Sequence, residues 1–255
     1  MTNREILTAA MEQSAQDLSC RAKDFCAAEN QVVASVPNSK ARKYLKLPFF
    51  CNLVSYGCNV VASVDPRIED IVRTYLDGAA APYRCFETPR LHLLEEAFRP
   101  FGKTICFMAE YYLPDVERLE VLACPFEVRI LHPSDFADCY TPQWSNALCE
   151  RRRQLDMLAA AAFDGDRMIG MAGCSADCET MWQIGIDVLP GYRNRGVASA
   201  LTSRLAAEIM QRGKIPFYCA AWSNIPSARN AIRSGFRPAW VELTAVDGEK
   251  AAGFQ

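Results

Sequence analysis

The spacing of apolar and polar residues predicts a mixture of helices and strands in the first half of the chain. Near the N-terminus, apolar residues recur on one side of a helix, and proline stands at the first turn of two later helices. We expect helices at residues 3–26, 66–76 and 89–98, an extended apolar run at 49–64 and a buried strand at 103–112. The charged stretch 116–120 predicts a domain boundary, which divides the chain into residues 1–120 and 121–255.

The second half alternates predicted strands with predicted helices. Val197, Leu201, Leu205 and Ile209 recur every four residues, as on the buried face of a long helix, and Gly213 stands where a C-cap glycine belongs. We expect strands at 126–131, 155–163, 167–174, 180–189, 216–222 and 236–246, helices at 194–212 and 227–233, a helical region opened by residues 132–134, and a hairpin turn at 164–166.

Composition and charge limit the kinds of partner. Of the 255 residues, 50% are hydrophobic and 23% are charged, as in soluble globular proteins. The formal net charge of −2 argues against a general partner of nucleic acid or of membrane surfaces. Polar residues interrupt the apolar stretch 47–64, and the charged N-terminal segment does not resemble a signal peptide. We therefore expect a cytoplasmic protein.

The 12 cysteines do not follow a metal-binding pattern. No C-x-x-C pair occurs, and only His92 and His132 stand elsewhere in the chain as possible nitrogen ligands. Several cysteines lie inside apolar, strand-like runs, where a thiol acts as a small hydrophobic group. We expect reduced thiols and no bound metal.

Candidate chemistry concentrates where the strand at 180–189 meets the following helix. The first N–H groups of a helix have no internal partner and attract anions. Arg193 and Arg195 add positive charge, and Gly196 and Ala198 are small enough for a phosphate to approach the backbone. The alternative is that the arginines are solvated and Gly196 only shapes the turn. The strand–helix–strand order at 180–222 favours the pyrophosphate site, because it places this turn at the carboxyl end of a strand.

The residues around this turn resemble a known family. The run from Arg193 to Ala198 fits the signature Arg/Gln-x-x-Gly-x-Gly/Ala of the GCN5-related N-acetyltransferases (GNAT), preceded by a similar Val-x-Pro-x-Tyr lead-in. Asn224 stands eleven residues before Gly235, as in that family's ending. The resemblance implies an α/β fold with a mixed sheet, acetyl-CoA as cosubstrate, and a small-molecule or peptide amine as acceptor. Residues 1–120 would be an extra N-terminal α/β domain, either like that of an acetyltransferase subgroup or a degenerate second copy.

The resemblance also implies roles for individual residues. The fourth and fifth strands would part, with the pantetheine arm paired to the backbone of Ile186 and Val188, and the N–H of Val188 would stabilise the oxyanion. Asn224 would fix the arm from the far side, although Asn-x-x-Ser also suits a helix cap. The pyrophosphate would be held by the turn residues Arg193, Asn194, Arg195, Gly196, Val197 and Ala198.

The family's usual proton-transfer residues are absent. Trp182 stands near the position of the family's glutamate base, and Ala231 stands at that of its tyrosine acid. Asp187, in the strand, and Asp177 or Glu179, in the turn before it, are the substitutes for the base. For each of these acids a purely structural role is the alternative. This absence also motivates a rival function, a non-catalytic acyl-CoA sensor, and a longer acyl group is a third option.

Other features have two interpretations each. The arginines at 151–153 suit a solvated helix face or a site for an anionic substrate. The four tryptophans at 144, 182, 222 and 240 suit core packing or the lining of an acceptor pocket. The sequence has no signature of the oligomeric state, and a homodimer is one option.

Overall fold

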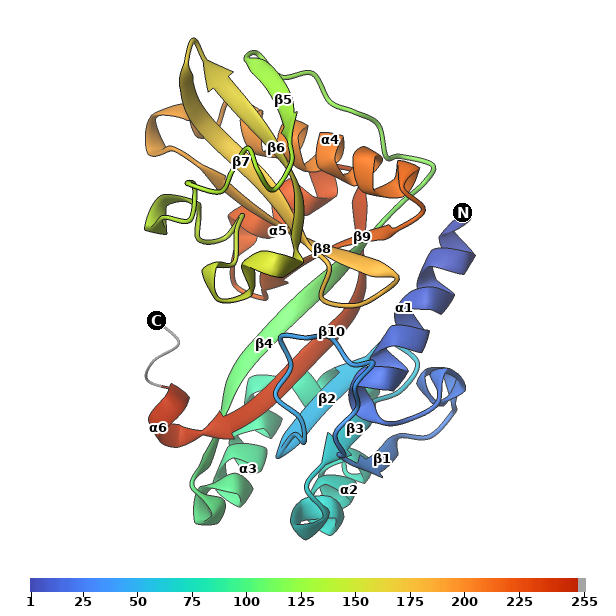
Figure 1. Cartoon of the computed structure of the whole chain (residues 1–255). Coiled ribbons are helices and arrows are strands. Elements are labelled where there is room, and N and C mark those ends of the chain that lie inside the picture. Colours follow the sequence, from blue (N-terminus) through green and yellow to red (C-terminus); the bar gives the residue numbers. More distant parts are fainter. Residues whose placement is uncertain (252–255) are drawn as a thin grey trace. The chain divides into compact units, whose positions relative to one another are not determined.

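The computed structural model describes residues 1–251, which form two compact units (Figure 1). Unit 1 comprises Met1–Leu7 and Tyr112–Pro238; unit 2 comprises Thr8–Tyr111 and residues 239–251. Each unit is therefore built from two separate stretches of chain. The units do not coincide with the predicted division after residue 120, since residues 112–120 pack in unit 1 and residues 239–251 in unit 2.

Unit 1 is built on a mixed sheet. Its strands are β5 (Glu127–Leu131), β6 (Asp156–Asp164), β7 (Arg167–Ser175), β8 (Met181–Val188) and β9 (Ile215–Ala221), in the order β9-β8-β7-β6-β5. The pair β8–β9 is parallel and the other pairs are antiparallel. The predicted hairpin is confirmed: β6 and β7 pair antiparallel across a turn in which Gly165 has φ +58°.

Helix α4 (Val197–Gln211) covers one face of this sheet, and α5 (Ile225–Arg233) follows β9. The four predicted core residues of α4 are all buried. A Cβ on Gly170 of β7 would lie 3.1 Å from Val197 Cγ1, so the helix packs directly on the strand backbone. The helix begins at Val197 rather than at the predicted Asn194, because Asn194 (φ +61°) and Gly196 (φ +80°) adopt left-handed conformations.

A long loop, residues 132–155, covers the opposite face of β7 and β8. The carbonyl oxygens of Ala147 and Asn146 would lie 2.0 and 1.8 Å from a Cβ on Gly173 and on Gly185. Gly173 and Gly185 face each other in the β7–β8 register. The predicted helical region after residue 134 is wrong: the loop has only the 3₁₀ turns Pro142–Trp144 and Glu150–Leu155. An α-helix is too wide to bring its backbone this close to a strand.

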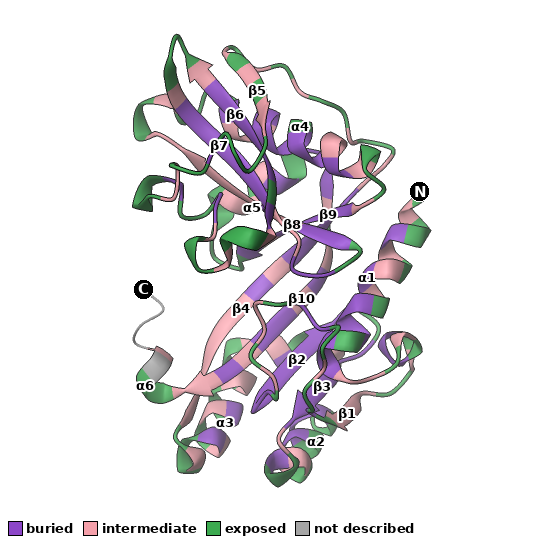
Figure 2. Cartoon of the chain, viewed as in Figure 1, coloured by how far each residue is buried: buried purple, intermediate pink, exposed green. Residues whose placement is uncertain are grey.

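Unit 2 contains most of the predicted helices. Its elements are α1 (Asn3–Leu18, which begins in unit 1), β1 (Gln31–Ala34), β2 (Cys51–Ser55), β3 (Val61–Val64), α2 (Glu69–Asp77), α3 (Thr88–Phe98), most of β4 (Lys103–Pro114) and of β10 (Phe236–Asp247), α6 (Gly248–Ala251) and the 3₁₀ turns Ala22–Cys26, Pro66–Ile68, Pro82–Phe86 and Arg99–Phe101. Its strand order is β1-β3-β2-β10-β4. Figure 2 shows β2 and β3 buried along their length.

Three predictions for unit 2 need correction. The first helix ends at Leu18, not at residue 26, because Ser19 adopts a left-handed conformation with φ +62°. The apolar run 49–64 is two antiparallel strands, β2 and β3, joined by a turn in which Gly57 has φ +103°. Strand β1 was not predicted, because four residues are too few to show a period. Within residues 1–251, no helix combines the length and the apolar composition that a bilayer crossing requires.

Candidate active site

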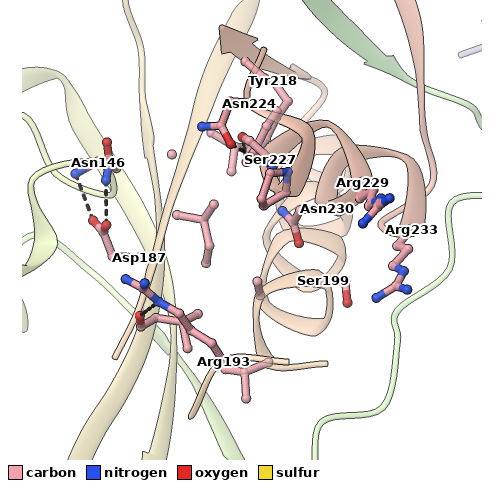
Figure 3. Close-up of a pocket in the computed structure, with 18 of the residues that line it drawn as sticks. Asn146, Asp187, Arg193, Ser199, Tyr218, Asn224, Ser227, Arg229, Asn230 and Arg233 are labelled. Atoms are coloured by element: carbon pink, nitrogen blue, oxygen red, sulfur yellow. Dashed lines mark hydrogen bonds between the residues drawn. The ribbon is translucent and has the colours of Figure 1, made fainter. Parts of the chain in front are cut away.

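Strands β8 and β9 pair along only part of their length. Their parallel register runs from Met181↔Ile215 to Ile184↔Tyr218. Beyond it, the residues from Gly185 to Val188 remain paired to β7 alone. A cleft of about 790 Å³ opens between the carboxyl-terminal ends of the two strands, with α4 and α5 forming its other wall (Figure 3).

Every second residue at the end of β8 points its backbone N–H and C=O groups toward this cleft. The N–H of Leu189 donates to the carbonyl oxygen of Ile169 on β7, at 2.9 Å. Because successive residues of a strand point their N–H and C=O groups to opposite sides, those of Val188 and Ile186 point away from β7. This side of Ile186 and Val188 lies beyond the last β8–β9 pair, so no strand covers it within residues 1–251.

The turn after β8 leaves an open corner at the start of α4. Arg193 Nε donates to the Val188 carbonyl oxygen at 3.0 Å, and the Arg195 guanidinium carbon lies 5.5 Å from the centre of the Tyr192 ring. Gly196 has φ +80°, and no heavy atom lies within 4 Å of the position of a Cβ there. Gly196 precedes α4 without a side-chain cap, so the first N–H groups of the helix face an accessible corner.

The structure brings together all the predicted cofactor-binding residues except one. Ile186, Val188, Arg193, Asn194, Gly196, Val197, Ala198 and Asn224 line the cleft. Arg195 is exposed and lies over Tyr192 instead.

Comparison with known proteins identifies this region. The sequence profile of the Acetyltransferase (GNAT) family matches residues 122–236. This part of the chain is a GNAT acetyltransferase domain. The cleft lies entirely within that match.

Solved structures with similar folds share little sequence with this chain. A GNAT-family acetyltransferase from Novosphingobium aromaticivorans is 19% identical, over 56% of this chain and 66% of that one, with a TM-score of 0.46. A GCN5-related N-acetyltransferase-like protein from Streptococcus suis is 19% identical, over 63% of this chain and 69% of that one, with a TM-score of 0.45. A tandem GNAT protein of the clavulanic acid biosynthesis pathway is 12% identical, over 60% of this chain and 57% of that one, with a TM-score of 0.43. The chain thus spans 66% of the first of these proteins and 57% of the third. No curated protein matches the chain.

Asn224 takes both of its predicted positions in the GNAT domain. Its Oδ1 accepts from the N–H of Ser227 at 3.2 Å, which caps α5, and its side chain also lines the cleft. The helix cap holds the asparagine at the rim of the cleft, on the wall opposite β8 (Figure 3). The two interpretations are therefore compatible.

Several polar residues of the cleft were not predicted from the sequence. Tyr218, the last paired residue of β9, shares a hydrogen bond of 2.8 Å with Ser227 Oγ, and burial raises the pKa of its hydroxyl. Arg229 and Arg233 of α5 also line the cleft, on the α5 wall (Figure 3). Their spacing of four residues on a predicted helix was a usable signal. Tyr218 had none, because it stands inside an apolar strand.

The three candidate bases lie in different places. Asp187 lines the cleft, but its carboxylate accepts from Asn146 N (2.8 Å), Asn146 Nδ2 (2.7 Å) and Ala147 N (3.0 Å), which holds the long loop on the sheet (Figure 3). Asp177 is buried, with Oδ1 3.1 Å from Arg152 Nε. Glu179 is exposed, before the first residue of β8 and outside the cleft lining, so the structure does not bring it to the site.

The two positions that hold proton-transfer residues in the family belong to the core here. Trp182 and Ala231 are both buried in the cluster that packs α4 against the sheet. Neither side chain can act as a general base. In the part of the chain that the structure describes, no group of three or more His, Cys, Asp or Glu residues is arranged to hold a metal ion.

Proposed function

We propose that the protein is an acetyl-CoA-dependent N-acetyltransferase in which an acceptor amine attacks the bound thioester directly. The observation that carries this proposal is the parting of β8 and β9 beside an uncapped helix N-terminus, inside a GNAT domain. The backbone groups of Ile186 and the N–H of Val188 suit the amide groups of a pantetheine arm, while the Val188 carbonyl oxygen already accepts from Arg193. The corner at Gly196 suits a diphosphate, because anions bind at helix N-termini.

The charges around the cleft fit a CoA molecule. Arg193 stands on the β8 side of the corner, and Arg229 and Arg233 stand on the α5 side. Asp187 is the cleft's acidic residue among those described, and three N–H donors from Asn146 and Ala147 already surround it. The cleft therefore presents a net positive surface to a ligand that carries several phosphate charges.

Acetyl-CoA supplies an activated acetyl group as a thioester. The acceptor must arrive as a neutral amine, although an alkylammonium group has a pKa of about 10. The amine nitrogen then forms a bond to the acyl carbon, the C–S bond breaks, and the leaving thiolate gains the proton that the nitrogen loses. A thiol of pKa roughly 8.5 is a tolerable leaving group.

The inner end of the cleft lies at Ile184 and Tyr218, the last pair of residues between β8 and β9. The acyl end of an arm that starts at Gly196 would therefore reach toward Gly185. The N–H of Ile186 lies nearer to this end than that of Val188, so we place the oxyanion donor at Ile186 rather than at the expected Val188. The Tyr218 hydroxyl, whose pKa burial raises, stays protonated and is the candidate donor to the thiolate.

Calorimetry tests the cofactor part of this proposal. Purified protein should bind CoA and acetyl-CoA, and thiol release from acetyl-CoA should require an added amine. Tyr218→Phe should lower the rate of thiol release while CoA binding is retained. Absence of CoA binding at millimolar ligand would refute the proposal.

A second candidate function is a non-catalytic acyl-CoA sensor. It is favoured by the occupied carboxylate of Asp187 and by the core positions of Trp182 and Ala231. A panel of alkylamines, polyamines, amino acids and aminoglycosides separates the two functions, with free thiol as the readout. Binding of acetyl-CoA without turnover of any amine would favour the sensor, and a series of acyl-CoA chain lengths tests for a longer acyl group.

A further inference from the structure

A second cavity lies on the loop-covered face of the GNAT domain. It has a volume of about 240 Å³, between the sheet and the loop segment from Ser145 to Arg152. Asn146, Gln183 and Gly185 line both this cavity and the CoA cleft. The two spaces therefore share a wall at the end of the cleft where the proposed acyl group would lie. Ser145 and Asn146 are exposed, which places the shared wall near solvent.

A buried carboxylate stands at the far side of this cavity. In the sheet register, Asp156 of β6 faces Ser175 of β7, and Ser175 faces Gln183 of β8. Facing residues of neighbouring strands project on the same side, and all three line the cavity. Asp156 is only 3% exposed, and burial raises the pKa of its carboxyl group.

One oxygen of Asp156 is held by the loop and the other is not. Oδ2 accepts from Cys149 N at 2.9 Å and from the Tyr140 hydroxyl at 3.1 Å. Both hydrogen bonds that Asp156 accepts within residues 1–251 end on this oxygen. Oδ1 is thus the acceptor available to a ligand, and an ammonium partner would form a charge-assisted hydrogen bond with it.

The other charged residue of the cavity is already balanced. Arg152 lines the cavity, and its Nε lies 3.1 Å from Oδ1 of Asp177, which is fully buried. These two charges cancel. The remaining charge at the cavity is the negative one of Asp156, which favours a cation over the anionic substrate considered for the arginine cluster.

We propose that this cavity recognises an acceptor with two amino groups, one of which binds Asp156 as an ammonium while the other is acetylated beside Gly185. The inference rests on the proposed function, since it takes the acyl group to lie at the closed end of the cleft. Neighbouring strands lie about 4.8 Å apart and residues along a strand rise about 3.3 Å each, so Asp156 and Gly185, two strands and two residues apart in the register, are separated by roughly 12 Å. A linear aliphatic diamine spans this interval once the reach of the carboxylate side chain is included.

A chain-length series tests this inference. Putrescine, cadaverine and hexamethylenediamine are each compared with the matched monoamine, namely butylamine, pentylamine or hexylamine. The readouts are thiol release from acetyl-CoA and calorimetric binding to the CoA-loaded protein. At least one diamine should exceed its monoamine by about tenfold or more in kcat/KM or in affinity, as expected for one charge-assisted contact. Aminovaleric acid, which has a carboxylate at the distal end, should be the poorest acceptor.

Asp156→Asn is the decisive variant. Asparagine keeps an acceptor for Cys149 N–H and the Tyr140 hydroxyl but removes the charge, so the diamine preference, measured as the ratio of diamine to monoamine kcat/KM, should disappear while CoA binding remains. Asp166→Asn removes the same charge from the exposed β6–β7 turn and should leave the preference intact. Thermal melting checks that both variants are folded.

The possible results separate the two proposals. Loss of CoA binding by the unmodified protein refutes the proposed function itself. If the protein binds CoA but no diamine binds or reacts better than its matched monoamine, only the proposed role of the cavity is overturned. A diamine preference that survives Asp156→Asn, or a preference for aminovaleric acid, also overturns it, the latter in favour of Arg152 as an anion site.

Discussion

The β-strands of the two units complete their hydrogen bonds in different ways. In unit 2, all 5 residues of β2 pair with β10, and 4 of them also pair with β3 on the other side. In unit 1, β8 has 8 residues, but only the first 4 pair with β9. Four of the five β2 residues are thus paired on both sides, whereas the last four residues of β8 pair with β7 alone and line a cleft.

Buried polar side chains follow the same contrast. In unit 2 they bind one another: Arg42 Nη1 lies 2.5 Å from Asp17 Oδ2, and Asn52 Nδ2 donates to Glu242 Oε1 at 2.9 Å. In unit 1, two buried residues with polar groups, Tyr218 and Asp156, each border a cavity. These two contacts of unit 2 serve stability, whereas Tyr218 and Asp156 of unit 1 border spaces that a ligand could fill.

The largest effect is expected from breaking the buried ion pair of unit 2. Arg42→Ala leaves Asp17 as a buried charge without its cation, and both side chains are only 2% exposed. The free energy of unfolding should fall by about 3–5 kcal/mol, measured by urea denaturation. Arg67→Ala breaks the exposed pair with Asp65 and should cost less than about 1 kcal/mol. If the two variants lost equal amounts of unfolding free energy, the buried ion pair would contribute no more than the exposed one, contrary to this prediction.

The next effect concerns the loop that lies on β8. Gly185→Ala places a Cβ 1.8 Å from the Asn146 carbonyl oxygen, so the loop must move. We expect a loss of about 1–3 kcal/mol in unfolding free energy, together with weaker diamine selectivity, because the wall shared by cleft and cavity shifts. Gly191→Ala is the matched control, since no heavy atom lies within 4 Å of its Cβ position. Wild-type stability of Gly185→Ala would show that the loop is not packed as described.

A smaller effect is expected at the phosphate corner. Arg193→Ala removes one exposed guanidinium while the N–H groups of α4 remain, so CoA affinity should fall only about tenfold, or ~1.4 kcal/mol. Binding of pantetheine, which has no diphosphate, should change less. Arg151→Ala, an exposed arginine outside the cleft lining, serves as control. Equal losses for CoA and pantetheine in calorimetry would argue against a pyrophosphate at this corner.

The geometry of the corner at Gly196 could be predicted from the sequence better than that of the cavity at Asp156, for a physical reason. The corner at Arg193–Ala198 is local: strand end, turn and helix start are consecutive, so their chemistry can be read from one stretch of chain. The cavity at Asp156 depends on strand register and on a loop that two glycines admit, and neither has a sequence period. For the same reason, the pairing of Val241–Ala245 with β2 was not predicted.

The smallest expected effect is a pH dependence in the polar core of unit 2. Burial raises the pKa of Glu242, so the folded state binds a proton there more tightly than the unfolded state does. The stabilisation from this group is therefore complete below its ordinary pKa and is lost as the pH rises through the raised value. Glu242→Gln keeps an oxygen for the Asn52 amide but cannot ionise, so its unfolding free energy should gain on the wild type as the pH rises from acidic toward neutral. Urea denaturation across that range measures the difference between the two proteins, with Glu249→Gln in α6 as the control. A difference that did not change with pH would mean that Arg42 and the donors around Glu242 stabilise its negative charge as well as water does. The charges of this polar core would then be balanced within unit 2, as its hydrogen bonds are.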